Sequence, residues 1–141
     1  MARSMTPEEV RSFLMEGTRT AKVATVRVDG SPHVAPVWFV LDGDDVIFTT
    51  GKTSVKGRTL ARERRAALTV DDERAPFSFV VVEGPVDLSD GVDVLLARTT
   101  RIAARYLPDQ AEEYGRRNAA AGELLVRLRP DRVMGETGLT D

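Results

Sequence analysis

A short segment rich in basic and hydroxyl side chains is the part of the sequence best suited to hold an anion. It runs from Gly51 to Arg65 and carries six basic side chains against one acid, Glu63, a net charge of +5. The whole chain of 141 residues has a formal net charge of −2, so the rest of it is acidic. A local basic patch on an acidic protein favours one anionic ligand over a nucleic-acid surface.

Within this segment, Lys56 and Arg58 are the side chains that we expect to bind a phosphate group. The segment joins a predicted strand to a predicted helix, whose N-terminus offers free backbone N–H groups and a partial positive charge. Hydroxyl donors are added by Thr50, Thr53 and Ser54. Phosphate binding needs this combination of convergent donors and full positive charge. The segment lacks the GxxxxGK[ST] pattern of nucleotide-binding P-loops.

A solvated basic helix face is the alternative interpretation of the same residues. Arg58, Arg62 and Arg65 are spaced to share one outward face, where they would only make the helix soluble. The hydroxyls and the helix start favour phosphate binding for Lys56 and Arg58. Arg62, Arg64 and Arg65 are predicted to lie at the edge of such a site.

The only histidine and two phenylalanines are further candidates. His33 follows a turn on a predicted strand and could hydrogen-bond a ring cofactor or donate a proton near neutral pH. Phe77 and Phe79 share one face of another predicted strand and could flank a planar ring. A plain structural role is the alternative for all three. One histidine among scattered acids, in a chain without cysteine, gives no metal site.

Several classes of enzyme are excluded by what the sequence lacks. It contains no serine–histidine–acid arrangement, no paired catalytic carboxylates and no glycine-rich dinucleotide fingerprint. An enzyme without obvious acid–base groups usually takes its chemistry from a cofactor. The sequence has neither a signal-peptide pattern nor an apolar run long enough to span a bilayer, so we expect a cytoplasmic protein.

The elements that must position these residues are mainly short strands. Helices are predicted after Thr6, over Lys52–Glu63, Val92–Tyr106 and Asp109–Ala121. Strands are predicted over Ala21–Val28, His33–Leu41, Val46–Thr50, Ala66–Val70, Phe77–Glu83 (continuing past Gly84-Pro85 to Leu88) and Leu124–Leu128, with a last short pairing segment at Arg132–Met134.

The spacing of these strands predicts the fold class. Asp29-Gly30 is a strong hairpin signal, and the first three strands are expected to form an antiparallel meander in which Pro36 marks an edge or a bulge. Six short strands at this spacing predict a mainly β (α+β) protein, a small antiparallel barrel with peripheral helices. The length suits one domain, residues 1–141.

Several of these segments resemble, in order and spacing, the split-barrel family of pyridoxamine-phosphate oxidases. They are Ala24–Val37 (ATVRVDGSPHVAPV), Ile47–Thr50 (IFTT), Lys56–Leu60 (KGRTL), Arg65–Asp71 (RAALTVD) and Val81–Gly84 (VVEG). Together they span nearly half the chain, and the branch they resemble most uses the deazaflavin coenzyme F-420. Ser54 stands where family members often have a basic residue. The chain lacks the longer C-terminal segment of true pyridoxamine-phosphate oxidases, so that activity is not expected.

The resemblance implies a six-stranded split barrel that binds FMN or a relative of it and forms a homodimer with cofactor sites at the interface. It implies that Lys56 and Arg58, near Thr50 and Ser54, bind the cofactor phosphate. It also implies that the segment Pro32–Val37 lines the ring and ribityl chain, and that Phe77 and Phe79 reach the site from the partner subunit. The lining segment includes His33, Val34, Pro36 and Val37.

The function that we predict from the resemblance is a deazaflavin-dependent reductase, passing a hydride from reduced coenzyme F-420 to a small unsaturated or conjugated acceptor. The anionic oligoglutamate tail of that coenzyme suits the additional charge of Arg62, Arg64 and Arg65. FMN on the same fold, a non-catalytic flavin or deazaflavin carrier, and a barrel without cofactor are the alternatives. No nucleic acid, membrane or metal partner is expected. A solvent proton or a nearby donor, for which His33 is the candidate, would complete the reduction.

Overall fold

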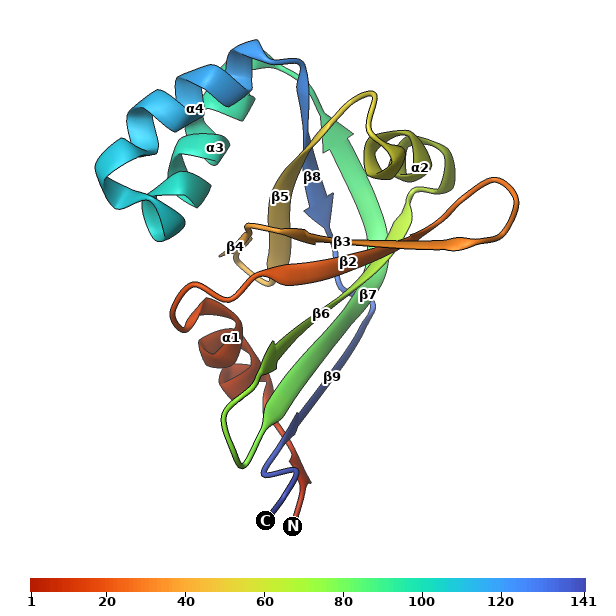
Figure 1. Ribbon diagram of the computed structural model, residues 1–141, viewed down its shortest axis with the longest axis vertical. Coiled ribbons are helices and arrows are strands. Elements are labelled where there is room, and N and C mark those ends of the chain that lie inside the picture. The colour runs from red at the N-terminus through yellow and green to blue at the C-terminus, as the bar shows by residue number, and fades with distance from the viewer.

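The computed structural model describes residues 1–141 as a strongly curled antiparallel sheet with helices around it (Figure 1). The strands are β1 (Arg3–Ser4), β2 (Ala21–Val26), β3 (Pro32–Val37), β4 (Val40–Asp42), β5 (Asp45–Gly51), β6 (Arg65–Asp72), β7 (Ser78–Ser89), β8 (Glu123–Leu128) and β9 (Arg132–Thr137). The helices are α1 (Pro7–Met15), α2 (Val55–Glu63), α3 (Val92–Tyr106) and α4 (Ala111–Ala120), with a 3₁₀ turn, η1, at Pro108–Gln110.

The predicted fold class is confirmed, with more strands than the six expected. The strands run in the order β3-β2-β6-β7-β8-β5-β4, and β9 lies beside the first half of β7, where it also pairs with the short β1. The additional strands are β1, the full-length β9 and β4, which is separate from β3. No helix has the length and apolar character needed to cross a membrane.

One long strand, β7, connects the two halves of the sheet. Its first half pairs with β6 and β9, and its last four residues, Val86–Ser89, pair with β8. The strand passes through Gly84, as the sequence predicts. A Cβ atom at Gly84 would overlap the carbonyl oxygen of Arg129, so the close approach of the β8–β9 loop requires a residue without a side chain.

The prediction of one strand over His33–Leu41 in a three-stranded meander was wrong. The segment divides at Trp38, so that β3 pairs only with β2 whereas β4 pairs only with β5. Trp38 leaves the sheet to stack on Tyr106 of α3, with ring centroids 5.0 Å apart and planes at 3°. β3 lies at the edge of the sheet, where the missing N–H of Pro36 leaves no ladder hydrogen bond unmade. The edge position predicted from Pro36 is therefore confirmed.

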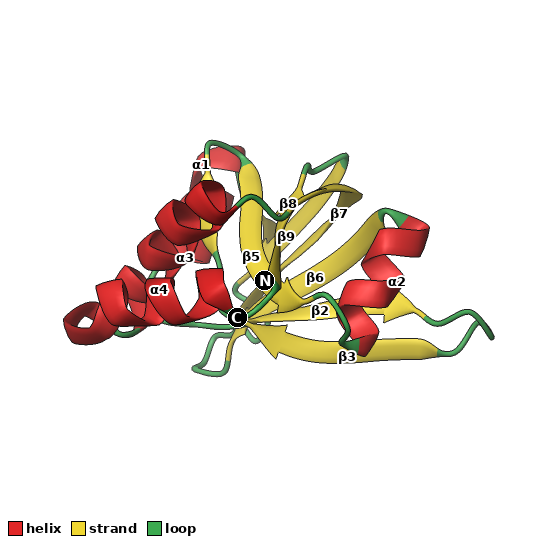
Figure 2. Cartoon of the chain, turned by 90° about the horizontal axis from the view of Figure 1, so that it is seen from above, coloured by secondary structure: helices red, strands yellow, loops and turns green.

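The inner face of the curled sheet forms the main hydrophobic core. It contains the alternate residues of β6 and β7, such as Leu68, Val70, Val80 and Val82, all at most 2% exposed. Helix α1 packs beside this core, and its first turn is closed by a capping box between Thr6 and Glu9. A second cluster lies where the α3–α4 hairpin covers β5 and β8 (Figure 2).

Candidate functional site

A cavity of about 330 Å³ lies where α2, the end of β3, β5 and the α3–α4 hairpin meet. It brings together three of the predicted site residues, Lys56, Pro36 and Val37. Its volume is at the lower end of the range of small-molecule pockets, which is enough for a phosphate and part of a chain. The remaining wall is formed by residues from α3, α4 and β8, among them Thr99, Tyr114, Asn118 and Glu123.

Lys56 is the one cation that lines this cavity. It lies in the first turn of α2, and its ammonium group forms no ion pair. Burial lowers the pKa of Lys56 below its ordinary value of 10.5, and the nearby Glu123 carboxylate opposes this shift. A partly desolvated cation without a partner gains more from an incoming anion than a cation at the open surface.

Ser54 fixes the start of α2 and therefore the position of Lys56. Its hydroxyl accepts a hydrogen bond from the Gly57 N–H (3.0 Å) and lies 2.9 Å from the Gly51 carbonyl oxygen and 3.1 Å from the Thr50 hydroxyl. The predicted helix therefore begins at Val55, three residues later than Lys52, and ends at Glu63 as predicted. These bonds use both hydroxyls within the protein, so the direct binding of phosphate by Thr50 and Ser54 stays a prediction.

Of the arginines in the basic segment, Arg58 is the only one whose side chain makes no hydrogen bond or ion pair. Arg62 donates to the carbonyl oxygen of Val26 (2.7 Å), and Arg64 donates to the carbonyl of its own helix at Ala61 (3.1 Å). Arg65 pairs with Asp131 at 2.9 Å. Arg58 is exposed. The three other arginines are therefore engaged in contacts within the protein, which the spacing in the sequence could not show.

His33 and Val34 lie on β3 outside the lining of the cavity. His33 faces inward, directly opposite Thr25 of β2, and its Nδ1 atom is buried without a hydrogen-bond partner. Val34 points outward and is 65% exposed. The two residues are on the strand that carries Pro36 and Val37, but the turn of the chain at Trp38 brings only the end of that strand to the cavity.

Phe77 and Phe79 lie together at a different hollow, on the outer face of the sheet. They line it with Lys22, Thr69 and Asp71. Phe77 precedes β7 and has a positive φ of 63°, while Phe79 is half-buried. The two aromatic side chains are therefore grouped as predicted, but within one chain they contribute nothing to the lining of the cavity that holds Lys56.

Sequence reasoning missed the wall of the cavity that α3, α4 and β8 supply. Glu123 is the first residue of β8, three positions after the end of α4, and opposes Gly51 across the β5–β8 ladder. One oxygen of its carboxylate, Oε2, is buried without a hydrogen-bond partner, and burial raises the pKa of Glu123 above its ordinary value of 4.5. The sequence gives no signal for this residue, since nothing in it shows that position 123 lies beside position 56.

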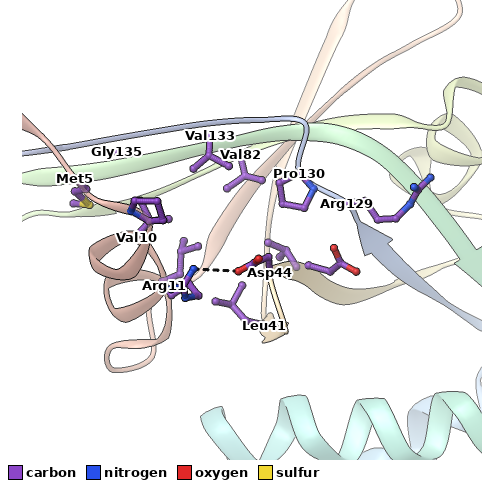
Figure 3. A pocket seen from close by; sticks show the side chains of 14 residues that line it. Met5, Val10, Arg11, Leu41, Asp44, Val82, Arg129, Pro130, Val133 and Gly135 are labelled. Atoms are coloured by element: carbon purple, nitrogen blue, oxygen red, sulfur yellow. Dashed lines mark hydrogen bonds and ion pairs between the residues drawn. The ribbon is translucent and has the colours of Figure 1, made fainter.

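A second cavity, of about 420 Å³, lies between α1, the β4–β5 turn and the β8–β9 loop (Figure 3). Its lining includes the apolar side chains of Val10, Leu41 and Val82, and the ion pair of Arg11 with Asp44 (3.3 Å) lies among them. It contains none of the predicted site residues, and each of its charged side chains already has an ion-pair partner. The cavity of Lys56 is therefore the better candidate.

Comparisons with known proteins agree with this fold. The family model described as pyridoxamine 5'-phosphate oxidase matches residues 6–134. A conserved hypothetical protein of Mycobacterium tuberculosis, Rv2991, shares 21% identity at a TM-score of 0.83, covering 93% of this chain and 84% of its own. A solved structure described as an F420 reductase shares 26% identity at a TM-score of 0.70, with coverages of 86% and 94%.

An FAD-binding protein from Mycobacterium smegmatis shares 18% identity at a TM-score of 0.63, covering 95% of this chain and 98% of its own. No curated protein matches the sequence. The family model covers most of the chain, and the structural neighbours have the same fold over nearly their whole length. The chain belongs to the pyridoxamine 5'-phosphate oxidase family of split-barrel proteins.

Proposed function

We propose that this protein binds the phosphate of coenzyme F-420 at Lys56 and uses the reduced coenzyme to reduce a small unsaturated or conjugated acceptor. The observation that carries the proposal is the unpaired, partly desolvated Lys56 ammonium in a cavity of ligand size. A neighbour at 26% identity is described as an F420 reductase, which supports this choice of cofactor. We also propose a cytoplasmic location.

The bound coenzyme would supply a hydride, and the protein would bind, orient and shield it. Lys56 would hold the phosphate, and Pro36 and Val37 would contact the chain or ring beside it. No acid–base group of this chain other than Lys56, Tyr114 and Glu123 lines the cavity. His33 lies outside that lining, and its role as a proton donor stays a prediction.

FMN is the second candidate, and one observation favours it. Arg62, Arg64 and Arg65 are each engaged in contacts within the protein, so they are not a free binding surface for an oligoglutamate tail. Only Arg58 is available for that tail. A neighbour of the same fold is described as an FAD-binding protein.

A parallel fluorescence titration of the purified protein with coenzyme F-420, FMN and riboflavin tests the proposal. We expect F-420 to bind at micromolar concentration or tighter, and riboflavin, which lacks the phosphate, to bind about 10- to 100-fold more weakly than FMN, because it cannot pair with Lys56. Tighter binding of FMN than of F-420 would move the protein to the flavin branch. Absence of binding by all three would contradict the proposal.

We further propose that the protein is a homodimer formed through the outer face of the sheet. The strand registers place a set of small and apolar side chains on this face, interrupted by charged ones such as Lys22 and Glu83. The set comprises Ala24, Val26, Val34, Pro36, Ala67, Phe79, Val81 and Met134. Several are unusually exposed, including Val34 at 65% and Val26 at 49%. An apolar face of this kind favours burial against a partner, which would bring Phe77 and Phe79 towards the other subunit's site.

Replacing Val81 with glutamate should convert the dimer to monomers. Val81 lies between Thr69 and Met134 near the centre of this face, and a two-fold contact would bury two new charges close to each other. We expect the dimer dissociation constant to rise by on the order of 100-fold, measured by sedimentation velocity. The control is Val92→Glu, at an exposed position at the start of α3; equal dissociation of both variants would contradict this interface.

A further inference from the structure

The last turn of α3 carries a half-buried arginine whose charge faces backbone carbonyls instead of a carboxylate. Each of the three guanidinium nitrogens of Arg105 donates to a different carbonyl oxygen, those of Leu14 (2.8 Å), Gly17 (3.0 Å) and Phe39 (2.8 Å). Burial lowers the pKa of Arg105 below its ordinary value of 12.5, and no acidic side chain opposes this shift. The cost of burying the charge is therefore offset by carbonyls from separate parts of the chain.

Two of these carbonyls lie at the C-terminal end of α1. Leu14 is in the last turn of that helix and Gly17 follows it, and the turn has no basic residue of its own. The last carbonyls of a helix lack partners within the helix and carry partial negative charge, so a cation stabilises them. Arg105 supplies this cation from α3, 88 and 91 positions further along the chain.

The third carbonyl lies where the chain leaves the sheet between β3 and β4. Phe39 is the residue between Trp38 and the start of β4. Its N–H donates to the hydroxyl of Tyr106 (3.2 Å), which donates in turn to the carbonyl oxygen of Arg19 (2.8 Å). Trp38 stacks on the ring of the same tyrosine. The last turn of α3 therefore fixes both backbone groups of Phe39 and the side chain before it.

This break in the strand forms part of the wall of the Lys56 cavity. Pro36, Val37 and Trp38 line the cavity, whereas Arg105 does not. Arg105 can therefore act on a ligand there only by setting the position of this wall. The planar guanidinium donates in fixed directions, so it determines that position more closely than a flexible ammonium group could.

We propose that Arg105 is a positioning residue for the cofactor, which holds the wall formed by residues 36–38 against the part of the ligand beyond the phosphate and ties that wall to the end of α1. This inference rests on the proposed function. Lys56 and Arg105 then act on different parts of the same ligand, so the effects of replacing them are expected to be independent.

The position of the wall can be measured without a ligand, because Trp38 is the only tryptophan in the chain. Its emission and its quenching by acrylamide are compared in the full-length protein and in the Arg105→Met and Arg105→Lys variants. Dissociation constants are then measured by titration with FMN and riboflavin, and with coenzyme F-420 and its phosphate-free deazaflavin. The control is Arg98→Met, about two turns earlier in α3, where the arginine pairs with Asp42 at 3.5 Å and lies outside the cavity lining.

We expect Arg105→Met to move the emission of Trp38 to longer wavelength and to increase its quenching in protein that circular dichroism shows to be folded. The phosphorylated ligand and its phosphate-free counterpart should both bind about 10-fold more weakly, so that their ratio is kept. Lys56→Met, in contrast, should change this ratio. Arg105→Lys should recover only part of the loss, because lysine cannot donate to all three carbonyls at once. Arg98→Met should leave the emission and the affinities unchanged.

Unchanged emission and quenching of Trp38 in folded Arg105→Met would overturn the positioning role and leave the proposed function intact. Altered emission with unaltered affinities would also overturn it, because Arg105 would then serve stability alone. If the unaltered protein binds none of the four compounds, the proposed function fails and the role of Arg105 in cofactor binding fails with it. If Arg105→Met does not fold, Tyr106→Phe, which removes only the hydroxyl bonded to Phe39, replaces it, with an expected loss of about 2- to 10-fold for both members of each ligand pair.

Discussion

Replacing Lys56 with methionine is expected to weaken the binding of a flavin or deazaflavin phosphate by about 10- to 100-fold. Methionine keeps the length of the side chain and its apolar stem but removes the charge. Lys56 is the only cation that lines the cavity, so no neighbouring side chain in that lining can replace it. The loss should be seen with FMN or coenzyme F-420 and not with riboflavin, because riboflavin has no phosphate.

Lys52→Met is the matched control for this experiment. Lys52 lies in the same basic segment, but its ammonium pairs with Asp90 at 3.0 Å and does not line the cavity. Its replacement should change the affinity by less than about three-fold, because an exposed ion pair contributes little. Equal losses in the two variants would show that the charge of the whole segment, and not the position of Lys56, determines binding.

Replacing Gly57 with alanine is expected to destabilise the protein by about 2 to 4 kcal/mol and to abolish tight cofactor binding. A Cβ atom at Gly57 would overlap the carbonyl oxygen of Gly51, and it would lie 3.2 Å from the carbonyl oxygen of Lys52. Both are backbone atoms, so the clash can be relieved only by moving α2 away from the end of β5. That movement would carry Lys56, the preceding residue, out of its position in the cavity.

The free energy of unfolding of Gly57→Ala is measured by urea denaturation, with Gly91→Ala as the control. Gly91 is the N-cap residue of α3, and its Cβ position has no heavy atom within 4 Å, so we expect a change of about 1 kcal/mol or less. Unaltered stability of Gly57→Ala would contradict the close contact between α2 and the end of β5. If Gly57→Ala lost cofactor binding but kept its free energy of unfolding, the loss of binding would not be a consequence of destabilisation.

Local patterns in the sequence predicted most of the secondary structure, because each depends on residues close together in the chain. The helix over Val92–Tyr106 has the predicted ends, and the start of α2 follows from Ser54. The separation of β3 from β4 was not predictable in this way. It depends on the stacking of Trp38 against Tyr106. These residues are 68 positions apart, so the local spacing of apolar residues cannot indicate the contact.

The candidate site was predictable only on one side. Lys56 was found because positive charge, hydroxyl groups and a helix start occur within a few residues of each other. Glu123 and Thr99 belong to separate segments, each of which looks like an ordinary amphipathic helix or strand. The engagement of Arg62 and Arg65 was equally hidden, since their partners, Val26 and Asp131, are remote in sequence.

The position of β8 between β7 and β5 has a consequence for synthesis of the protein on the ribosome. β5 is complete at Gly51, but the strand that pairs with its second edge begins only at Glu123. During translation of the intervening residues, that edge of β5 has no partner and is open to pairing with other chains. The wall of the cavity that carries Glu123 is the last part of the site to be made, so a nascent chain can bring the two sides of the site together only after Glu123 has left the ribosome.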